Sequence, residues 1–262
     1  MAEKQIRFDD GDAYEKMMGV WSRLAGEVFL DWLATPPGLG WIDVGCGNGA
    51  FTELLVERAA PAKVEGIDPS EGQLAFARAR HKAGVAEFRA GDAAALPFPA
   101  ESFDAAVMAL VLFFVPEPAK GVAEMVRVVR PGGIIAAYLW NFPGGGFPLE
   151  PIMAEMRAMG LTPLLPPSAD ASRMEMLRGL WKDARLDAVA TKEIIVERSF
   201  PSFDDFWETS LLSASVGAAI KAMPPADAEQ LKARVRARLS ADGTSRIVLS
   251  ARANAIKGRV PK

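Results

Sequence analysis

An apolar stretch that ends in an acid and three alternating glycines constrains the fold of this chain more than any other feature. Residues 41–49 read Trp-Ile-Asp-Val-Gly-Cys-Gly-Asn-Gly, and an apolar helical pattern begins at Ala50. Glycine is needed where a backbone turns with positive φ or where a ligand approaches the main chain closely. The stretch therefore predicts a strand, a glycine-rich cofactor loop and a helix N-terminus in direct succession.

Short β-rich runs alternate with longer helical runs between residues 41 and 140. We expect strands at 40–44, 63–67, 85–90, 103–112 and 133–140, and helices at 50–60, 70–82 and 119–129. This alternation is typical of a parallel sheet whose strands are joined by crossover helices. Ser70 and Gln73 have the spacing of a capping box. A helix that starts there places Asp68 at the end of the second strand.

The pattern changes after residue 140. A loop rich in glycine and proline spans 142–148, helical patterns follow at 150–159 and 172–184, and we interpret 142–185 as an inserted helical cap. The cap holds five of the 11 methionines, which can line an adaptable pocket or simply pack two helices together. Strands are expected again at 189–198 and 247–255, with helices at 202–212 and 226–239 between them. The sequence thus predicts an α/β fold with a doubly wound, mostly parallel seven-stranded sheet.

Composition disfavours several classes of function. The 262 residues suit a single domain, and a net charge of −3 provides no basic surface for nucleic acid. The longest apolar run, 105–115, has 11 residues, about half of the ~20 that a membrane-spanning helix needs. The first ten residues show no apolar signal region, so we expect a cytoplasmic protein. With one cysteine and one histidine, neither a disulfide nor a bound metal is expected.

Two acids extend the cofactor hypothesis. Asp68 follows Gly49 by 19 residues, where a doubly wound sheet presents a carboxylate to a ribose diol. Asp92 follows the third expected strand and suits an adenine amino group. Ligands in such sheets bind outside the carboxyl ends of the strands, so these segments are expected to converge. A glycine loop alone is a weak signal, but its position relative to the two acids makes it stronger.

With these pieces together, the chain resembles the class I S-adenosylmethionine-dependent methyltransferases, particularly the small-molecule group related to quinone-biosynthesis methyltransferases. The matching segments, in order, are 14–23, 43–49, 66–70, 91–93, 103–116 and 127–133. The resemblance implies S-adenosylmethionine as the cofactor and the following cofactor-binding residues: Tyr14, Asp43, Gly45, Gly47, Asp68, Pro69, Gln73, Asp92, Ala93, Ala109 and Leu110.

The resemblance also implies a role for each position. The 45–49 loop would lie against the methionine part, with Asp43 near its amino group, and Asp68 would bind the ribose. Pro69 and Gln73 would flank the adenosine. Asp92 and Ala93 would contact the adenine edge, and Ala109 and Leu110 the methionyl end. Tyr14, in an N-terminal helical segment at 1–39, would close over the cofactor.

The chain departs from related enzymes where they often have a histidine. Its segment 112–116 contains Phe113 and Phe114 instead, so the sequence leaves open whether a general base exists, and we name no catalytic residue. Orientation of the reactants can contribute ~7–11 kcal/mol, against ~3–5 kcal/mol for a general base. We interpret Cys46 as a small loop residue, not a nucleophile. Candidates for the acceptor pocket are Phe113, Phe114, Tyr138, Trp140, Asn141 and Trp207.

The expected function is methyl transfer to a small-molecule acceptor by in-line displacement. Two other functions stay open: a non-catalytic S-adenosylmethionine-binding protein and a nicotinamide-dependent reductase. The Gly-x-Gly-x-Gly spacing disfavours the reductase, because dinucleotide-binding loops carry Gly-x-Gly-x-x-Gly. A cavity that opens from the methyl donor toward 142–185 would favour an enzyme over a binding protein. The acceptor, the methylated atom and the oligomeric state are left open by the sequence.

Overall fold

A central sheet organises the fold in the computed structural model, which describes residues 15–80, 84–239 and 246–262. Within these residues seven strands form one sheet in the order β3-β2-β1-β4-β5-β7-β6. The strands are β1 (Gly40–Val44), β2 (Lys63–Asp68), β3 (Ala86–Ala90), β4 (Phe103–Ala109), β5 (Val129–Trp140), β6 (Asp187–Phe200) and β7 (Ile247–Arg259). The first five pair in parallel, whereas β7 pairs antiparallel with both β5 and β6. The predicted doubly wound, mostly parallel seven-stranded sheet is confirmed.

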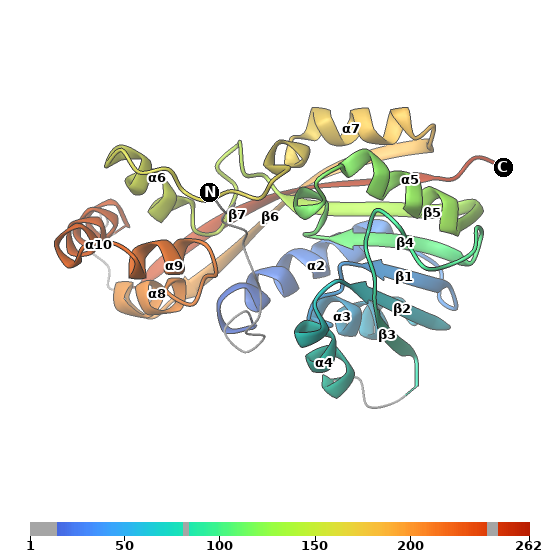
Figure 1. The fold of residues 1–262 in the computed structure, drawn as a ribbon, viewed down its shortest axis with the longest axis horizontal. Helices are drawn as coiled ribbons and strands as arrows, with labels where there is room; N and C mark the ends of the chain where they lie inside the picture. Colours follow the sequence, from blue (N-terminus) through green and yellow to red (C-terminus); the bar gives the residue numbers. More distant parts are fainter. Residues whose placement is uncertain (1–14, 81–83, 240–245) are drawn as a thin grey trace.

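Helices cover both faces of this sheet. In Figure 1, α5 (Pro118–Val128) and α7 (Met174–Asp183) lie on one side, and α2 (Val20–Leu33) and α3 (Ala50–Ala59) lie on the other. Since both faces are covered, the central strands are largely apolar, and β4 buries Ala105, Ala106, Val107 and Met108 completely. The remaining helices are α4 (Glu71–Arg80), α6 (Glu150–Ala158), α8 (Phe203–Ser210), α9 (Val216–Lys221) and α10 (Pro225–Leu239).

The later helices gather at one end of the molecule. Helices α6, α8, α9 and α10 lie together where the long strands β6 and β7 extend past the rest of the sheet (Figure 1). Short helical turns complete the described chain: η1 (Glu15–Gly19), η2 (Leu112–Phe114) and η3 (Ala169–Ser172). Because η2 and α6 follow the carboxyl ends of β4 and β5, segments distant in sequence meet at this edge of the sheet.

Most predicted elements match the observed ones within about two residues at each end, and the larger differences follow. Strand β7 continues to Arg259, whereas its expected end was at 255. Strand β4 ends at Ala109 rather than at 112, because Leu110 adopts a left-handed backbone with φ of 62°. Strand β5 begins at Val129, four residues before the expected start, with irregular pairing to β4 near Phe103. Helix α9 was not predicted. The predicted cap of α4 is confirmed, since the Gln73 backbone N–H donates to Ser70 Oγ at 3.4 Å.

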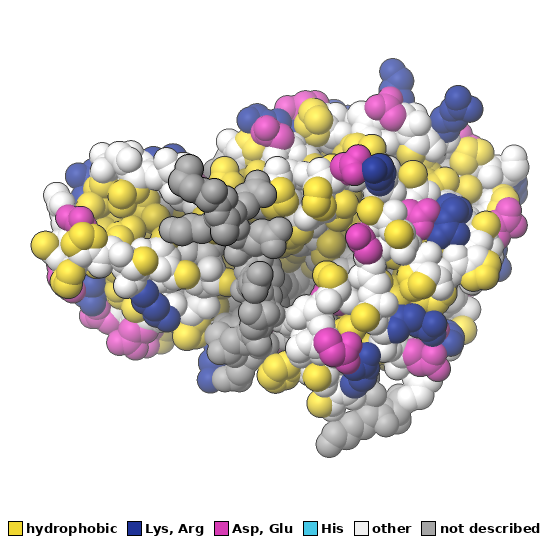
Figure 2. All heavy atoms as spheres, viewed as in Figure 1, with side chains coloured by type: hydrophobic (Ala, Val, Ile, Leu, Met, Phe, Trp, Pro, Cys, Tyr) yellow, Lys and Arg dark blue, Asp and Glu magenta, His cyan; other side chains and the backbone are white. Residues whose placement is uncertain are grey.

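The surface carries mixed charge. On the face shown in Figure 2, acidic and basic side chains are interspersed, and no continuous basic stripe is visible. Several charged side chains form ion pairs, such as Arg234 and Arg238 with Glu155 at 2.9 Å each. Across the described ranges, no helix has the length and apolar character that crossing a membrane requires.

Candidate functional site

The predicted cofactor loop joins β1 to α3 at the carboxyl edge of the sheet. Gly45, Gly47 and Gly49 all have positive φ, at 79°, 53° and 79°. The backbone N–H groups of Gly45 and Cys46 both donate to the carbonyl of Ile67, at 2.6 and 3.0 Å. The loop is thereby fixed to the end of β2 in a conformation that other residues rarely adopt.

The first two of these glycines have different surroundings. A Cβ on Gly45 would lie 2.4 Å from Cγ1 of Val111, so the close approach of the β4–η2 segment requires glycine there. A Cβ on Gly47 would meet nothing within 4 Å. Gly45 therefore serves packing, and Gly47 leaves its backbone open to a ligand.

Asp68, at the end of β2, holds two neighbouring segments. Its Oδ2 accepts from the Gly47 N–H at 3.0 Å and its Oδ1 accepts from the Ser70 N–H at 2.9 Å. An ionised carboxylate has about four lone-pair sites, so about two stay available for further donors. Burial raises the pKa of the Asp68 carboxyl, although the two backbone donors oppose the shift.

Asp43, in β1, is completely buried and only half satisfied. Its Oδ2 accepts from Thr52 Oγ1 at 2.7 Å, whereas its Oδ1 has no hydrogen-bond partner in the part of the chain that the structure describes. Burial raises the pKa of Asp43 from 3.8 to about 7, with a small contribution from the charge of Asp68. An unpartnered buried carboxylate oxygen is unusual, and a bound cationic group or a water would satisfy it.

The other predicted cofactor residues lie along the same edge. After β3, Asp92 is exposed and its Oδ1 accepts from the Ala94 N–H at 2.8 Å, while Ala93 is half-buried. After β2, Pro69 is exposed and Gln73 is buried. The ends of β1, β2 and β3 thus carry the three predicted acids, as the sequence indicated.

The end of β4 has a backbone conformation that no sequence pattern predicted. Leu110 has a φ of 62°, its N–H donates to the carbonyl of Tyr138 at 2.8 Å, and its side chain is buried. A left-handed conformation in leucine costs roughly 1–3 kcal/mol and is retained when the surroundings impose it. It turns the chain away from the half-buried Ala109 and into η2, beside the glycine loop.

The N-terminal segment contacts the loop through a residue that we did not predict. Tyr14 lies outside the described residues. Its neighbour Glu15 accepts at Oε2 from Asn48 Nδ2 at 3.1 Å and from Arg80 at 2.9 Å. These contacts join η1, the cofactor loop and α4. The sequence signal was the polar Asn48 within the glycine loop, but its partner could not be read from local patterns.

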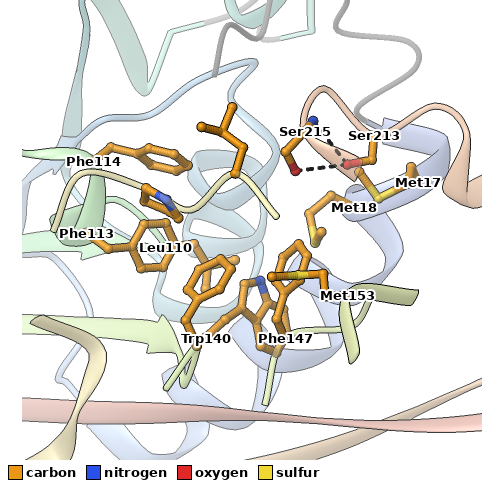
Figure 3. A pocket seen from close by; sticks show the side chains of 13 residues that line it. Met17, Met18, Leu110, Phe113, Phe114, Trp140, Phe147, Met153, Ser213 and Ser215 are labelled. Carbon is orange, nitrogen blue, oxygen red and sulfur yellow. Dashed lines mark hydrogen bonds between the residues drawn. The ribbon is translucent and has the colours of Figure 1, made fainter. Parts of the chain in front are cut away.

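An apolar pocket adjoins the end of β4. Figure 3 shows side chains from the N-terminal segment, from β4–η2, from 140–166 and from the α8–α9 turn that converge on it. The volume of the pocket is about 50 Å³. Its lining is Met17, Met18, Leu110, Phe113, Phe114, Trp140, Phe142, Phe147, Met153, Leu164, Pro166, Ser213 and Ser215.

The structure brings together three of the six candidates for the acceptor pocket. Phe113, Phe114 and Trp140 line it. The other three do not: Tyr138 packs against Phe29 with ring centroids 4.6 Å apart, Trp207 stacks on Phe203 at 6.1 Å, and Asn141 accepts from the Gly144 N–H. The missed lining residues include Ser213 and Ser215, about 70 residues away from Trp140 in the sequence.

No ionisable side chain belongs to the lining among the described residues. Cys46 is buried in the loop, where desolvation holds the pKa of its thiol well above the usual value. A neutral buried thiol is a poor nucleophile, which agrees with a loop role for Cys46.

The fold and the site define the class of protein. A doubly wound sheet with a glycine loop after β1, acids in the last two residues of β1 and β2 and an acid just after β3 is an architecture for a nucleoside cofactor, bound where the strand order reverses between β1 and β4. Residues 42–137 match a family model described as a methyltransferase domain. These residues therefore form a methyltransferase domain of the class I S-adenosylmethionine-dependent type, and the cofactor is S-adenosylmethionine.

Individual proteins agree with this assignment. A fatty-acid O-methyltransferase of Mycolicibacterium smegmatis is 33% identical over 166 residues, which are 63% of this chain and 57% of that protein. A demethylmenaquinone methyltransferase of Renibacterium salmoninarum is 36% identical over 141 residues, 53% of this chain and 56% of that protein. The chain therefore spans a little over half the length of these relatives.

A solved structure shares the fold. The phosphoethanolamine N-methyltransferase 2 of Haemonchus contortus, in complex with S-adenosyl-L-methionine, superposes with a TM-score of 0.58 at 16% identity. The match covers 100% of this chain and 61% of that chain. At this identity the similarity supports the fold alone.

Proposed function

We propose that this protein transfers a methyl group from S-adenosylmethionine to an apolar small molecule held in the pocket beside Leu110. The main support for the proposal is the position of the pocket, which begins at the carboxyl end of β4, on the same edge of the sheet as the predicted cofactor residues. Leu110 lines the pocket, and it follows Ala109 directly at the end of β4. An acceptor in the pocket would lie next to the methyl group.

The residues at the cofactor edge fit this cofactor. Oδ1 of Asp43 lacks a partner that an ammonium group would supply, and Asp68 keeps about two lone-pair sites for the two ribose hydroxyls. The open backbone at Gly47 leaves space for the methionine part. Asp92 and Ala93 would contact the adenine, with Pro69 and Gln73 beside the adenosine. We also assign a covering role to η1, because Glu15 contacts Asn48 of the loop.

The protein's part in the chemistry is orientation and exclusion of water. When bound, S-adenosylmethionine would supply a methyl group on a positively charged sulfur. The C–S bond would break with its electron pair staying on sulfur as the acceptor bonds to the methyl carbon, and an acceptor hydroxyl would release its proton to solvent. The described pocket lining offers no general base, so Phe113, Phe114 and Trp140 must act by holding the acceptor in line. Such positioning can lower the barrier by ~7–11 kcal/mol, which is more than a general base would add.

The pocket must enlarge to admit an acceptor. Its volume of about 50 Å³ is smaller than the ~150 Å³ of an engineered cavity that binds benzene. Three methionines, Met17, Met18 and Met153, line it, and their flexible side chains can move aside. Since five lining residues come from 142–166, we assign to segment 142–185 the role of a cap that closes over the acceptor.

The relatives support an acceptor with an apolar body. The names fatty-acid O-methyltransferase and demethylmenaquinone methyltransferase both agree with a pocket of phenylalanine, methionine and tryptophan side chains. A cationic or phosphorylated acceptor would lose its hydration on entering the pocket, and the described lining offers no opposite charge in return. Such a transfer of a charge out of water is costly.

A pair of methionine variants tests the proposal. Met153 is buried in the pocket wall, whereas Met176 on α7 is 47% exposed. We expect Met153→Glu to lower methyl transfer to fatty-acid, phenol or quinol acceptors by ~10-fold or more, because an unpaired carboxylate would enter the pocket. Met176→Glu should leave transfer unchanged. Binding of S-adenosylhomocysteine, measured by calorimetry, should be equal in both variants and the wild type.

The two alternative functions predict other outcomes of this experiment. A non-catalytic binding protein would bind S-adenosylhomocysteine and methylate no acceptor. A reductase would bind NADH in its place, which the family assignment already opposes. Transfer to polar phosphorylated amines, with none to apolar acceptors, would refute the proposed acceptor class while leaving the methyltransferase assignment intact.

A further inference from the structure

One hydrogen-bond donor in the pocket wall has no partner among the described residues. Trp140 is the last residue of β5, it is 2% exposed, and its indole Nε1–H makes no hydrogen bond to residues 15–80, 84–239 or 246–262. Figure 3 shows this nitrogen on the ring edge turned toward the interior of the pocket, near Met18 and Met153. Buried polar groups are nearly always paired, so an unpaired donor in a pocket wall indicates a ligand.

Two other buried indoles show what is particular to Trp140. Nε1 of Trp181 donates to the carbonyl of Ile135 at 3.4 Å, which satisfies it within the fold. Nε1 of Trp41 is also buried without a partner, but Trp41 is not part of the pocket lining. Among these three buried indoles, Trp140 alone combines an unpaired donor with a place in the pocket.

The polar groups opposite Trp140 are engaged with one another. Oγ of Ser213 accepts from the backbone N–H of Ser215 at 3.3 Å and of Val216 at 3.2 Å. The hydroxyls of Ser213 and Ser215 lie 3.3 Å apart and share a further hydrogen bond (Figure 3). These serines therefore support the turn between α8 and α9. One hydrogen bond between two hydroxyls leaves one O–H proton, so this hydroxyl and the Trp140 indole N–H are the two donors that the lining offers; a hydroxyl can also accept, whereas the indole N–H can only donate.

We propose that the Trp140 indole donates a hydrogen bond to an oxygen of the acceptor, and so selects oxygen-bearing apolar molecules over hydrocarbons and protonated amines. This inference rests on the proposed function and specifies its acceptor class. An indole N–H can only donate, so its partner must carry a lone pair, which an ammonium group lacks. Trp140 is thus a specificity-determining residue that fixes which end of the acceptor lies beside the methyl group.

Phenol and toluene are matched probes for this donor, because they have nearly the same shape and differ in one hydroxyl. The measurement is the indole N–H resonance of Trp140 in ¹⁵N-labelled protein saturated with S-adenosylhomocysteine, assigned by its loss in Trp140→Phe. We expect phenol to move the Trp140 N–H proton downfield and toluene to leave it without a downfield shift. The N–H of Trp41, assigned with Trp41→Phe, should move with neither probe.

The variants provide a second readout. The ratio of phenol affinity to toluene affinity should fall ~2–13-fold in Trp140→Phe, the range for losing one neutral hydrogen bond. The ratio should stay unchanged in Trp41→Phe, which removes an equally buried indole outside the pocket. The ratio cancels any general loosening of the fold that either substitution causes.

Each other result overturns the inference. Equal shifts with phenol and toluene would show that only ring packing affects Trp140, and no shift with either would show that the indole faces no ligand. If S-adenosylhomocysteine binds and an apolar acceptor is methylated in the same preparation, the proposed function survives that failure. If S-adenosylhomocysteine does not bind, the proposed function fails first.

Discussion

Replacing Asp68 should separate the cofactor site from the stability of the fold. The Asp68 carboxylate accepts from Gly47 and Ser70, and we assign its remaining lone pairs to the ribose hydroxyls. The loss of a charged hydrogen-bond partner costs ~1.5–3 kcal/mol. We therefore expect Asp68→Ala to weaken S-adenosylhomocysteine binding by ~10–150-fold in isothermal titration calorimetry.

Asp104 provides the matched control. Its carboxylate also accepts a backbone hydrogen bond, from the Gly40 N–H at 2.7 Å, and forms an ion pair with Arg130 at 2.5 Å. It lies near the start of β4, at the opposite edge of the sheet from the cofactor site. Asp104→Ala should thus lower the free energy of unfolding while leaving cofactor affinity unchanged.

The comparison decides between a binding role and a structural one. Asp68→Ala also leaves the Gly47 and Ser70 amides without acceptors, so some loss of stability is expected in both variants. Equal weakening of binding in the two variants would mean that a loosened sheet, not a lost ribose contact, reduces affinity. Unchanged affinity in Asp68→Ala would refute the ribose role outright.

Two further predictions concern β1 and its loop. Burial raises the pKa of Asp43 from 3.8 to about 7, so between these pH values the folded state binds a proton that the unfolded state has lost. The free energy of unfolding should therefore fall by about 4 kcal/mol as the pH rises from 3.8 to about 7, and then level off. Urea unfolding at a series of pH values should show this decrease in the wild type without cofactor, but not in Asp43→Asn. An equal decrease in both proteins would mean that another group causes it. Gly45→Ala should cost roughly 1–3 kcal/mol of stability, because its Cβ would overlap Val111, whereas Gly47→Ala should weaken S-adenosylhomocysteine binding more than it lowers stability. The roles given to these glycines would be contradicted if Gly47→Ala lowered thermal stability more than Gly45→Ala did, and if Gly45→Ala weakened S-adenosylhomocysteine binding more than Gly47→Ala did.

The cofactor edge could be predicted from the sequence because its signals are local. The glycine loop, the capping Ser70 and Asp68 lie within 30 residues of one another and follow strands with clear apolar runs. Loop chemistry and strand periodicity act at this range, so the elements from β1 to β4 were placed within a few residues. The left-handed Leu110 is an exception, since a leucine carries no sequence signal for that conformation.

The acceptor pocket could be predicted only in part because it is assembled by tertiary contacts. Aromatic residues near the ends of β4 and β5 were natural candidates, yet Tyr138 and Trp140, two positions apart, have different surroundings. Tyr138 packs among Phe29 and other core rings, whereas Trp140 reaches the pocket. Ser213 enters through the turn before the unpredicted α9, and no local pattern links that turn to β5.

The cofactor edge and the acceptor pocket differ in charge, and the family match includes more of the first than of the second. The acids at the ends of β1, β2 and β3 suit a cationic cofactor, while the described pocket beyond β4 carries no charged side chain. The family match at 42–137 contains those acids, but of the pocket lining it includes only Leu110, Phe113 and Phe114. Relatives can therefore share the methyl donor and differ in the acceptor. The acceptor of this protein follows from the residues outside that match, and among them Trp140 offers the unpaired donor on which selection can act.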